Sequence, residues 1–546
     1  MKIPSPILRT YQSLHTWTGI IAGLFLFIGF FAGALTMFKA PIDAWSSPPQ
    51  ATLSHLNNKQ YDRLIEKAAS EFPDIAHGFT IDLNPEHSPM TWYESGSARE
   101  PGLADRMRHA SLDEQDQLIT LVHTPNQLGT LIDYLHRSAG IPGEIGHHLV
   151  GGYIVGIAAL LYFLALISGL IILLPTLTKS FFALRTNKGA SRFWLDSHNL
   201  LGVTSFPFHV VIALTAVVFA FHDFFYAGLF LVYGDTPLFA RTAEAAVAYQ
   251  LDTLPSIEAH IRAAQAYVSG YQVTSLSFSG LETTNPFATL TLFNEHEVMR
   301  GPHYDYLFMN PYTLEITGST FNPGNEGVWS RIVASFFALH FGSYGGEWIR
   351  WVYFFLGLAG AALFYTGNLL WLEKRRNKSQ PAQRNSTTRM AALTIGVCLG
   401  SIAGVMAAIL ITKWAAFSQL NVNEVYLWVY YATFLSALGY AFWQGASKAA
   451  IHLLGIITLL CLLIPLTTFC ASLLLPTVWF NTQGTAWYVE LIAIMFALFA
   501  FFGQRQVRRR AYQGDQNSIW FIAQAVSDGP DTHLPFKKVS EQPLNE

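Results

Sequence analysis

The stretch that decides the fold is LHTWTGIIAGLFLF at residues 14–27, because it returns in diverged form as SHNLLGVTSFPFHV at residues 197–210. Aligning the two copies pairs His15 with His198, and each histidine stands near the start of an apolar run. Internal repetition of this kind predicts a chain built from two halves that share one plan.

A second motif repeats in the same order. LHRSAG at residues 135–140 resembles LHFGSYGG at residues 339–346, which pairs His136 with His340 just before another long apolar run. Each half is therefore expected to contain a helix, a polar domain and a second helix. Two such halves are expected to pack as a four-helix bundle about a pseudo-twofold axis along a membrane normal.

The composition places this bundle in a membrane. Of the 546 residues, 51% are hydrophobic and 13% are charged, whereas about 25% charge is usual in soluble domains. Several apolar runs reach the ~20 residues that cross a hydrocarbon core of ~30 Å. The fold class predicted is therefore a membrane α-helical protein, and the last four runs have no counterpart in the repeat. Eight transmembrane helices are predicted, at 17–38, 147–174, 199–233, 347–372, 390–412, 424–443, 450–473 and 486–503.

Basic residues gather at one set of helix ends. They precede the first run and follow the second, fourth, sixth and eighth, so the positive-inside rule places both termini in the cytoplasm. The long polar segments then lie outside, in the periplasm of a bacterial inner membrane. The predicted boundaries are 1–39 for the first helix, 40–145 for the first periplasmic domain, 146–233 for helices two and three, 234–328 for the second periplasmic domain, 329–376 for helix four, 388–504 for the last four helices and 505–546 for a cytoplasmic tail.

Both polar segments are expected to form small α+β domains. The second reads as a helix at 256–269 followed by four short strands between residues 273 and 317. The first opens in the same way, with a helix at 61–71 and strands at 79–83 and 90–94, but its later half is more polar. A net charge of −3 argues against a nucleic-acid partner.

The four repeated histidines suit haem. An ionisable side chain at membrane depth usually faces the bundle interior and has a partner. His15 and His198 share the cytoplasmic depth, whereas His136 and His340 share the opposite one. Facing imidazoles between helices rich in Phe and Gly are typical of six-coordinate haem b, so two haems stacked across the membrane are predicted.

Other histidines leave alternatives open. His209 lies 11 residues beyond His198, about 16.5 Å along one helix face, so it is an alternative ligand for the outer site, with His148, or a hydrogen-bonding residue in the bundle. His147 and His148 could instead anchor the outer interface. His222 and His452 are expected to be structural.

Arginines near the two sites could pair with haem propionates, because a guanidinium fork matches a carboxylate, or could simply anchor the interface. The candidates are Arg9 and Arg192 at the inner site and Arg137 and Arg350 at the outer site.

These motifs resemble a known family. LHTWTG, LHR, WLDSHNLLG, LHFGSYGG and YTGNLLWL are similar to motifs of the PepSY-associated transmembrane helix (PepSY_TM) family, and YDYLFMNPYTLEITG resembles the end of a PepSY module. The resemblance covers about residues 8–376 and implies a bacterial inner-membrane protein linked to iron acquisition, some members being di-haem ferrisiderophore reductases. It also implies four axial ligands, His15, His136, His198 and His340.

The expected function is electron transfer by an oxidoreductase to a ferric siderophore or other ferric chelate in the periplasm. No catalytic acid or base is predicted, because reduction to the softer Fe(II) is itself enough to loosen a complex of hard oxygen donors. No Gly-rich nucleotide fingerprint is present, so a quinol or a cytoplasmic reductase must donate the electrons. The alternatives are a membrane-anchored binding or regulatory protein and an iron or siderophore permease.

Overall fold

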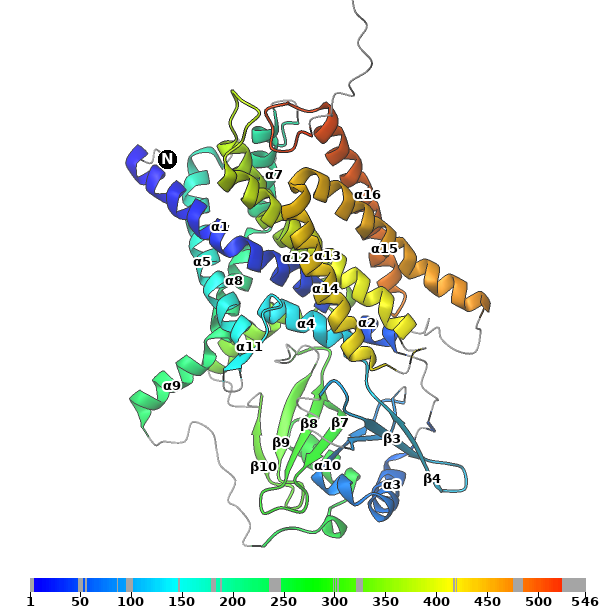
Figure 1. The fold of residues 1–546 in the computed structure, drawn as a ribbon. Coiled ribbons are helices and arrows are strands. Elements are labelled where there is room, and N and C mark those ends of the chain that lie inside the picture. Colours follow the sequence, from blue (N-terminus) through cyan, green and yellow to red (C-terminus); the bar gives the residue numbers. More distant parts are fainter. Residues whose placement is uncertain are drawn as a thin grey trace, which may run out of the picture.

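The structure, a computed structural model, describes residues 4–522 except 48–52, 55, 86, 95–101, 146–147, 178–182, 187–188, 235–246, 298, 300, 302–303, 321–327, 416–417, 419 and 475–484. It consists of a large helical layer and an antiparallel sheet that lies against one end of the helices (Figure 1).

Seven helices in the described part of the chain are long and apolar enough to cross a membrane. The predicted membrane α-helical class is therefore confirmed. The seven are α1 (Ser5–Thr36), α5 (Val150–Leu173), α12 (Gly346–Arg375), α13 (Asn385–Ala415), α14 (Val422–Gln444), α15 (Ala446–Leu474) and α16 (Tyr488–Gln513).

The predicted third span, 199–233, is not one straight helix. It is broken into α7 (Ala190–Thr204), α8 (Phe206–Ala220) and α9 (His222–Tyr233), and α7 and α8 meet at an angle of 72°. Pro207 explains the first break, because proline has no N–H for the preceding turn and is tolerated only in the first turn of a helix. The number of spans rises to eight if the bent pair crosses the membrane as one unit.

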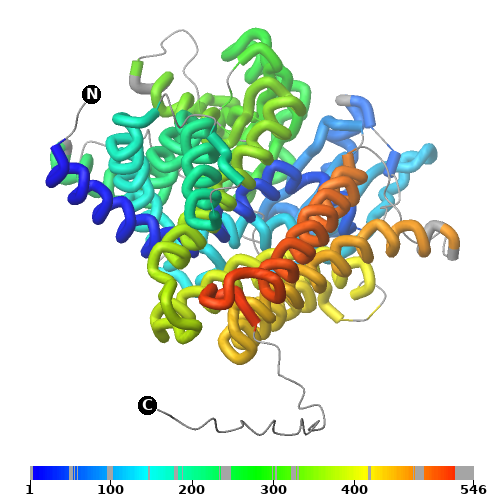
Figure 2. The backbone as a smooth tube through the Cα atoms, turned by 90° about the horizontal axis from the view of Figure 1, so that it is seen from above, coloured from blue at the N-terminus to red at the C-terminus, as the bar shows by residue number. Residues whose placement is uncertain are grey.

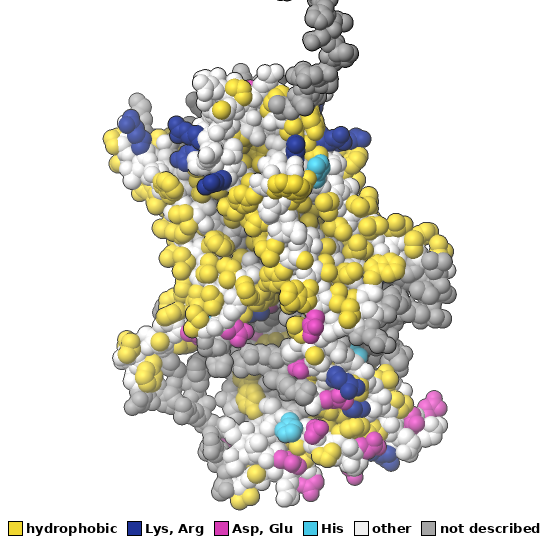
Figure 3. Space-filling view, viewed as in Figure 1, with side chains coloured by type: hydrophobic (Ala, Val, Ile, Leu, Met, Phe, Trp, Pro, Cys, Tyr) yellow, Lys and Arg dark blue, Asp and Glu magenta, His cyan; other side chains and the backbone are white. Residues whose placement is uncertain are grey.

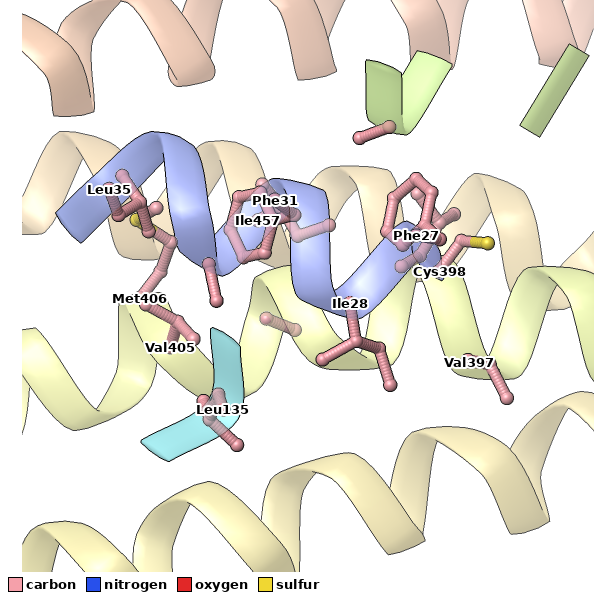
Figure 4. Packing of buried hydrophobic residues seen from close by; sticks show 14 of the residues in the cluster. Phe27, Ile28, Phe31, Leu35, Leu135, Val397, Cys398, Val405, Met406 and Ile457 are labelled. Atoms are coloured by element: carbon pink, nitrogen blue, oxygen red, sulfur yellow. The ribbon is translucent and has the colours of Figure 1, made fainter. Parts of the chain in front are cut away.

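The helices form two groups. α1, α5, α7, α8 and α12 pack together, and α13 to α16 lie along one side of this group (Figure 2). The contact between the groups is apolar: Phe27, Phe31 and Leu35 of α1 face Cys398 and Met406 of α13 (Figure 4). Between helices in a membrane, van der Waals packing of such side chains holds the two groups together, because lipid is as apolar as the side chains themselves.

Side chains on the surface divide the molecule into three zones. Hydrophobic residues cover a broad middle band, Lys and Arg gather at the end opposite the sheet, and Asp and Glu are more frequent towards the sheet (Figure 3). We call these two ends the basic end and the sheet end.

The two polar segments build one sheet rather than two separate ones. Its order is β10-β9-β8-β7-β1-β2-β3-β4, and the join is the antiparallel pair β1 (Gly78–Asp82) and β7 (Gln272–Ser279). The expected pair of independent domains is thus replaced by two similar units, each with one helix and four strands, that share a core. The other elements are α3 (Asn58–Glu71), β2 (Met90–Tyr93), β3 (Met107–Leu112), β4 (Leu118–His123), α10 (Ile257–Tyr267), β8 (Phe287–Phe293), β9 (Asp305–Met309) and β10 (Ile316–Ser319).

The C-terminal helices also brace a short layer between bundle and sheet, formed by α2 (Lys39–Ser46) and α4 (Leu128–Ser138). Asn423 of α14 accepts from the N–H of Gln127 at 3.0 Å and donates to the carbonyls of Leu103 and Pro125. The hydroxyl of Tyr431 donates to the carbonyl of Gly140 at 2.9 Å. These bonds fix both ends of α4.

Candidate functional site

The structure brings the four repeated histidines together as two pairs. His15 of α1 and His198 of α7 lie towards the basic end, with ring centroids 6.0 Å apart. His136 of α4 and His340 of α11 (Val328–Phe341) lie at the sheet end, with centroids 6.1 Å apart. We call them the basic-end pair and the sheet-end pair.

In three of these rings, Nδ1 is held by a backbone carbonyl of a neighbouring helix. His15 Nδ1 lies 2.8 Å from the oxygen of Ala165, His136 Nδ1 lies 2.8 Å from that of Gly29, and His198 Nδ1 lies 3.1 Å from that of Leu363. A carbonyl only accepts, so Nδ1 must donate its proton and Nε2 must keep its lone pair.

In the fourth ring, that of His340, Nδ1 donates to a hydroxyl instead of a carbonyl. His340 Nδ1 lies 2.8 Å from Thr215 Oγ1, and Thr215 Oγ1 donates its own proton to the carbonyl of Val211 at 2.7 Å. The hydroxyl must therefore accept from His340 Nδ1. All four rings consequently present a bare Nε2, which is the atom that binds metal when the other nitrogen is hydrogen-bonded.

The spacing of the pairs fits two axial ligands of one iron. An Fe–N bond of about 2.0 Å on each side, with each ring centroid about 1.1 Å beyond its nitrogen, gives centroids about 6 Å apart. Among the described residues, no cluster of three or more His, Cys, Asp or Glu side chains could hold a bare metal ion. Each pair offers two ligands, and a porphyrin leaves two coordination positions of its iron open.

Glycines make room for three of the rings. A Cβ on Gly33 would lie 2.6 Å from His136 Nδ1, and one on Gly169 would lie 3.0 Å from His15 Cε1. A Cβ on Gly367 would lie 3.2 Å from His198 Cε1. The sequence signals these positions only weakly, because glycine is common in apolar runs such as those that precede or follow the histidine motifs.

A cavity of about 1760 Å³ surrounds the sheet-end pair. This volume exceeds the roughly 300–1,000 Å³ of ordinary small-molecule pockets, so it can take a porphyrin and still leave space. It runs from Leu26 and Tyr162 inside the bundle to Glu297 and Tyr304 in the β8–β9 connection of the sheet.

Two of the four candidate arginines line this cavity. Arg137 pairs with Asp133 at 3.0 Å, and Arg350 pairs with Glu347 at 2.5 Å.

The other two arginines lie towards the basic end. Arg192 faces the buried carboxylate of Asp196 at 3.1 Å, which Arg185 also binds, and Arg9 is exposed on α1. Pairing of any of these arginines with a propionate stays a prediction.

The remaining histidines occupy different environments. His209 lies in the bundle core with Nε2 2.8 Å from Ser205 Oγ. His148 lines the sheet-end cavity, and His148 Nε2 and His222 Nε2 lie 2.8 and 3.2 Å from the carboxylate of Asp223. His452 contacts the hydroxyl of Tyr440, and His147 lies outside the described residues.

One further histidine pair lies in the sheet and was not singled out from the sequence. The rings of His109 and His123, on β3 and β4, stack with centroids 4.5 Å apart, and His109 Nδ1 lies 2.7 Å from Ser88 Oγ. Burial, and then the neighbouring His123, lower the pKa of His109 to about 4.

Comparison with known families gives one match. The model of the PepSY-associated TM region matches residues 12–374, which is more than half of the chain and includes all four paired histidines. No curated protein matches the sequence.

Proposed function

The chain belongs to the PepSY-associated TM family, and from this premise we propose that it is an inner-membrane di-haem b protein that passes electrons to a ferric chelate, such as a ferric siderophore, at the sheet end. The electrons come from a quinol or a cytoplasmic reductase at the basic end. When bound, haem supplies an iron that alternates between Fe(III) and Fe(II) and so carries one electron at a time.

The observation that carries this proposal is the matched geometry of the two imidazole pairs. Both have the spacing of axial ligands, and in all four rings the hydrogen bond at Nδ1 leaves the lone pair on Nε2. A histidine that served only as a polar residue at a helix end would not need a fixed tautomer.

The two pairs lie at different depths. His136 is hydrogen-bonded to the carbonyl of Gly29 on α1. Gly29 lies 14 residues after His15 on the same helix, which corresponds to a distance of about 21 Å along the helix axis. Two sites at this separation would cover much of a hydrocarbon core of ~30 Å.

The sheet-end cavity supports reduction on that side. It extends past His136 and His340 to the β8–β9 connection, where a bulky chelate could approach. One electron converts Fe(III) to Fe(II), a softer ion that hard oxygen donors bind less well, and the chelate then loses its metal.

The surface charge supports the orientation. Lys and Arg gather at the basic end, and by the positive-inside rule this end faces the cytoplasm (Figure 3). The sheet would then lie in the periplasm.

A stopped-flow experiment tests the reaction. Dithionite-reduced protein, freed of excess reductant, is mixed with a ferric hydroxamate in the presence of a coloured Fe(II)-specific chelator. We expect reoxidation of both haems and release of two Fe(II) per chain. The double variant H136A/H340A should lose the fast phase, whereas H452Q should keep it. Reduced protein that stays reduced with every ferric chelate tried would contradict the proposal.

A further inference from the structure

Four rings from four helices fill the bundle core between the two histidine pairs. Phe30 of α1 and Tyr162 of α5 lie 5.7 and 6.0 Å, centroid to centroid, from His209 of α8. Phe364 of α12 lies 4.8 Å from Tyr162. Two of these four side chains carry polar atoms, although His209 is fully buried and Tyr162 is only 3% exposed.

The tautomer of His209 follows from its one hydrogen bond. Ser205 Oγ donates its proton to the carbonyl of Leu201 at 2.5 Å, so it must accept from His209 Nε2. The opposite nitrogen, His209 Nδ1, therefore carries a lone pair, and among the described residues it has no partner. A buried acceptor without a partner is costly and calls for an explanation.

Tyr162 offers the complementary group. Its hydroxyl also has no partner among the described residues, and it can donate a proton. The residue lines the inner part of the sheet-end cavity, and its hydroxyl oxygen is itself buried. A donor and an acceptor that both lack partners, on adjacent rings, are suited to hold one bridging water.

We propose that Tyr162 and His209 form a water-bridged proton site between the two iron sites, which takes up a proton when the bundle is reduced and releases it on reoxidation. The first electron to enter the bundle converts one Fe(III) to Fe(II), and one proton then moves from solvent through the sheet-end cavity to His209 Nδ1, which has a single lone pair and so takes one proton per chain. The added positive charge offsets the added electron, which matters because charges interact strongly in an interior of low dielectric constant. This inference rests on the proposed function.

The surroundings of His209 make it the group that takes up the proton when the bundle is reduced. The rings that contact it are Phe30, Tyr162 and Phe208, and Tyr353 lies behind Phe208. The titratable side chains recorded against these rings are Tyr162, Tyr353 and, through its bond to Thr215 of α8, His340 of α11. The charged side chains of α1 and α12, such as Arg9, Glu347 and Arg350, lie nearer the ends of those helices.

Redox titration at several pH values is the first test. In the wild-type protein, the midpoint potential of at least one haem should fall as pH rises, at most by tenfold in the equilibrium constant per pH unit, which equals 59 mV for one electron. His209→Gln keeps a group that can reach Ser205, so it should retain two haems and lose most of this slope. The control His452→Gln should behave like wild type.

The outcomes separate this inference from the proposed function. Wild-type protein without haem contradicts the proposed function. Two haems with the same pH slope in wild type and His209→Gln, or no slope in wild type, overturn the proton site alone. Loss of a haem in His209→Gln would show that His209 is a ligand instead, which also overturns it.

A second variant tests whether a water bridges Tyr162 and His209, and its measurement, thermal stability, requires neither bound haem nor activity. If Tyr162 Oη holds a bridging water, Tyr162→Phe should lower the Tm of the purified protein, because His209 Nδ1 then loses its partner. The exposed Tyr512→Phe serves as control. A higher Tm for Tyr162→Phe would mean that the hydroxyl has no partner in the folded protein, and the proton site would be rejected.

Discussion

Each of the four paired histidines has a hydrogen bond from Nδ1 to a residue of another helix, and a substitution at Thr215 can remove one of these bonds alone. Such a bond makes an imidazole a stronger donor to iron and so favours Fe(III). Thr215→Val removes the acceptor of His340 at nearly constant volume. We expect both haems to remain and one midpoint potential to rise by about 40 mV, equivalent to ~1 kcal/mol for one hydrogen bond.

Potentiometric titration of the two haems measures this shift. Thr366→Val is the matched control, because Thr366 Oγ1 bonds only carbonyls of its own helix. Equal shifts in both variants would show that the effect does not pass through His340.

Gly33 is the second test at the residue scale. A Cβ there would lie 2.6 Å from His136 Nδ1, closer than real contacts allow, so the imidazole must move. Gly33→Ala should therefore lose the sheet-end haem and keep the basic-end haem, which haem analysis of the purified variant measures. Gly439→Ala, where a Cβ meets nothing within 4 Å, should retain both. Full haem content in Gly33→Ala would refute the assigned position of His136.

The buried pair in the sheet predicts a pH-dependent stability. The pKa of His109 is lowered to about 4, so the unfolded chain binds this proton more readily than the folded one. Stability is complete above the unfolded value of about 6.5 and is lost as pH falls towards 4, by about 3 kcal/mol for this group. Thermal unfolding between these pH values should show the loss in wild type and a weaker loss in His109→Asn. His296→Asn, whose ring is 84% exposed, should match wild type, and an unchanged profile in His109→Asn would count against the prediction.

At the scale of elements, Asn423 tests how the C-terminal helices support the site. Its side chain bonds three backbone groups at the ends of the segment that leads into α4. Asn423→Ala leaves these buried groups without partners, at about 1–3 kcal/mol each. We expect a lower unfolding temperature and preferential loss of the sheet-end haem. Asn421→Ala, which gives up one bond to the same loop and the capping bond that its side chain accepts from the N–H of Asn423, should have a smaller effect, and equal loss of the two haems in Asn423→Ala would argue against a local role.

The helices were largely predictable from the sequence, because long apolar runs have few alternatives in a membrane. The break in the third span was not, since apolar composition continues across Ser205 and only Pro207 signals the change. The two strands β3 and β4 were also missed. β3 shows no alternation of buried and exposed positions, and in β4 the exposed positions are the apolar residues Ile119 and Leu121, so neither strand follows the usual pattern of a half-buried strand.

The sequence repeat predicted the residues of the candidate site more accurately than it predicted the fold around them. It matched His15 with His198 and His136 with His340, and the structure brings the same residues together. Nothing in the sequence indicated that carbonyls and Thr215 would fix Nδ1, because these partners come from other helices. Ligation of iron stays a prediction.

At the scale of the whole molecule, the repeat extends from the membrane into the sheet. The two units join edge to edge through β1 and β7, as the two halves of the bundle join around the histidine pairs. Formation of one sheet removes two exposed strand edges that separate domains would have had to protect. The β8–β9 connection lines the sheet-end cavity, beside one histidine pair and away from the other.

The central claim is that two imidazole pairs each hold one haem, and haem counted per chain tests it most directly. Protein purified from cells with sufficient haem should show a Soret band, reduced α-bands of b-type haem and two haems per chain. His198→Ala and His340→Ala should each retain one haem, and the double variant none. A wild-type protein without a Soret band, or single variants that keep both haems, would contradict the account.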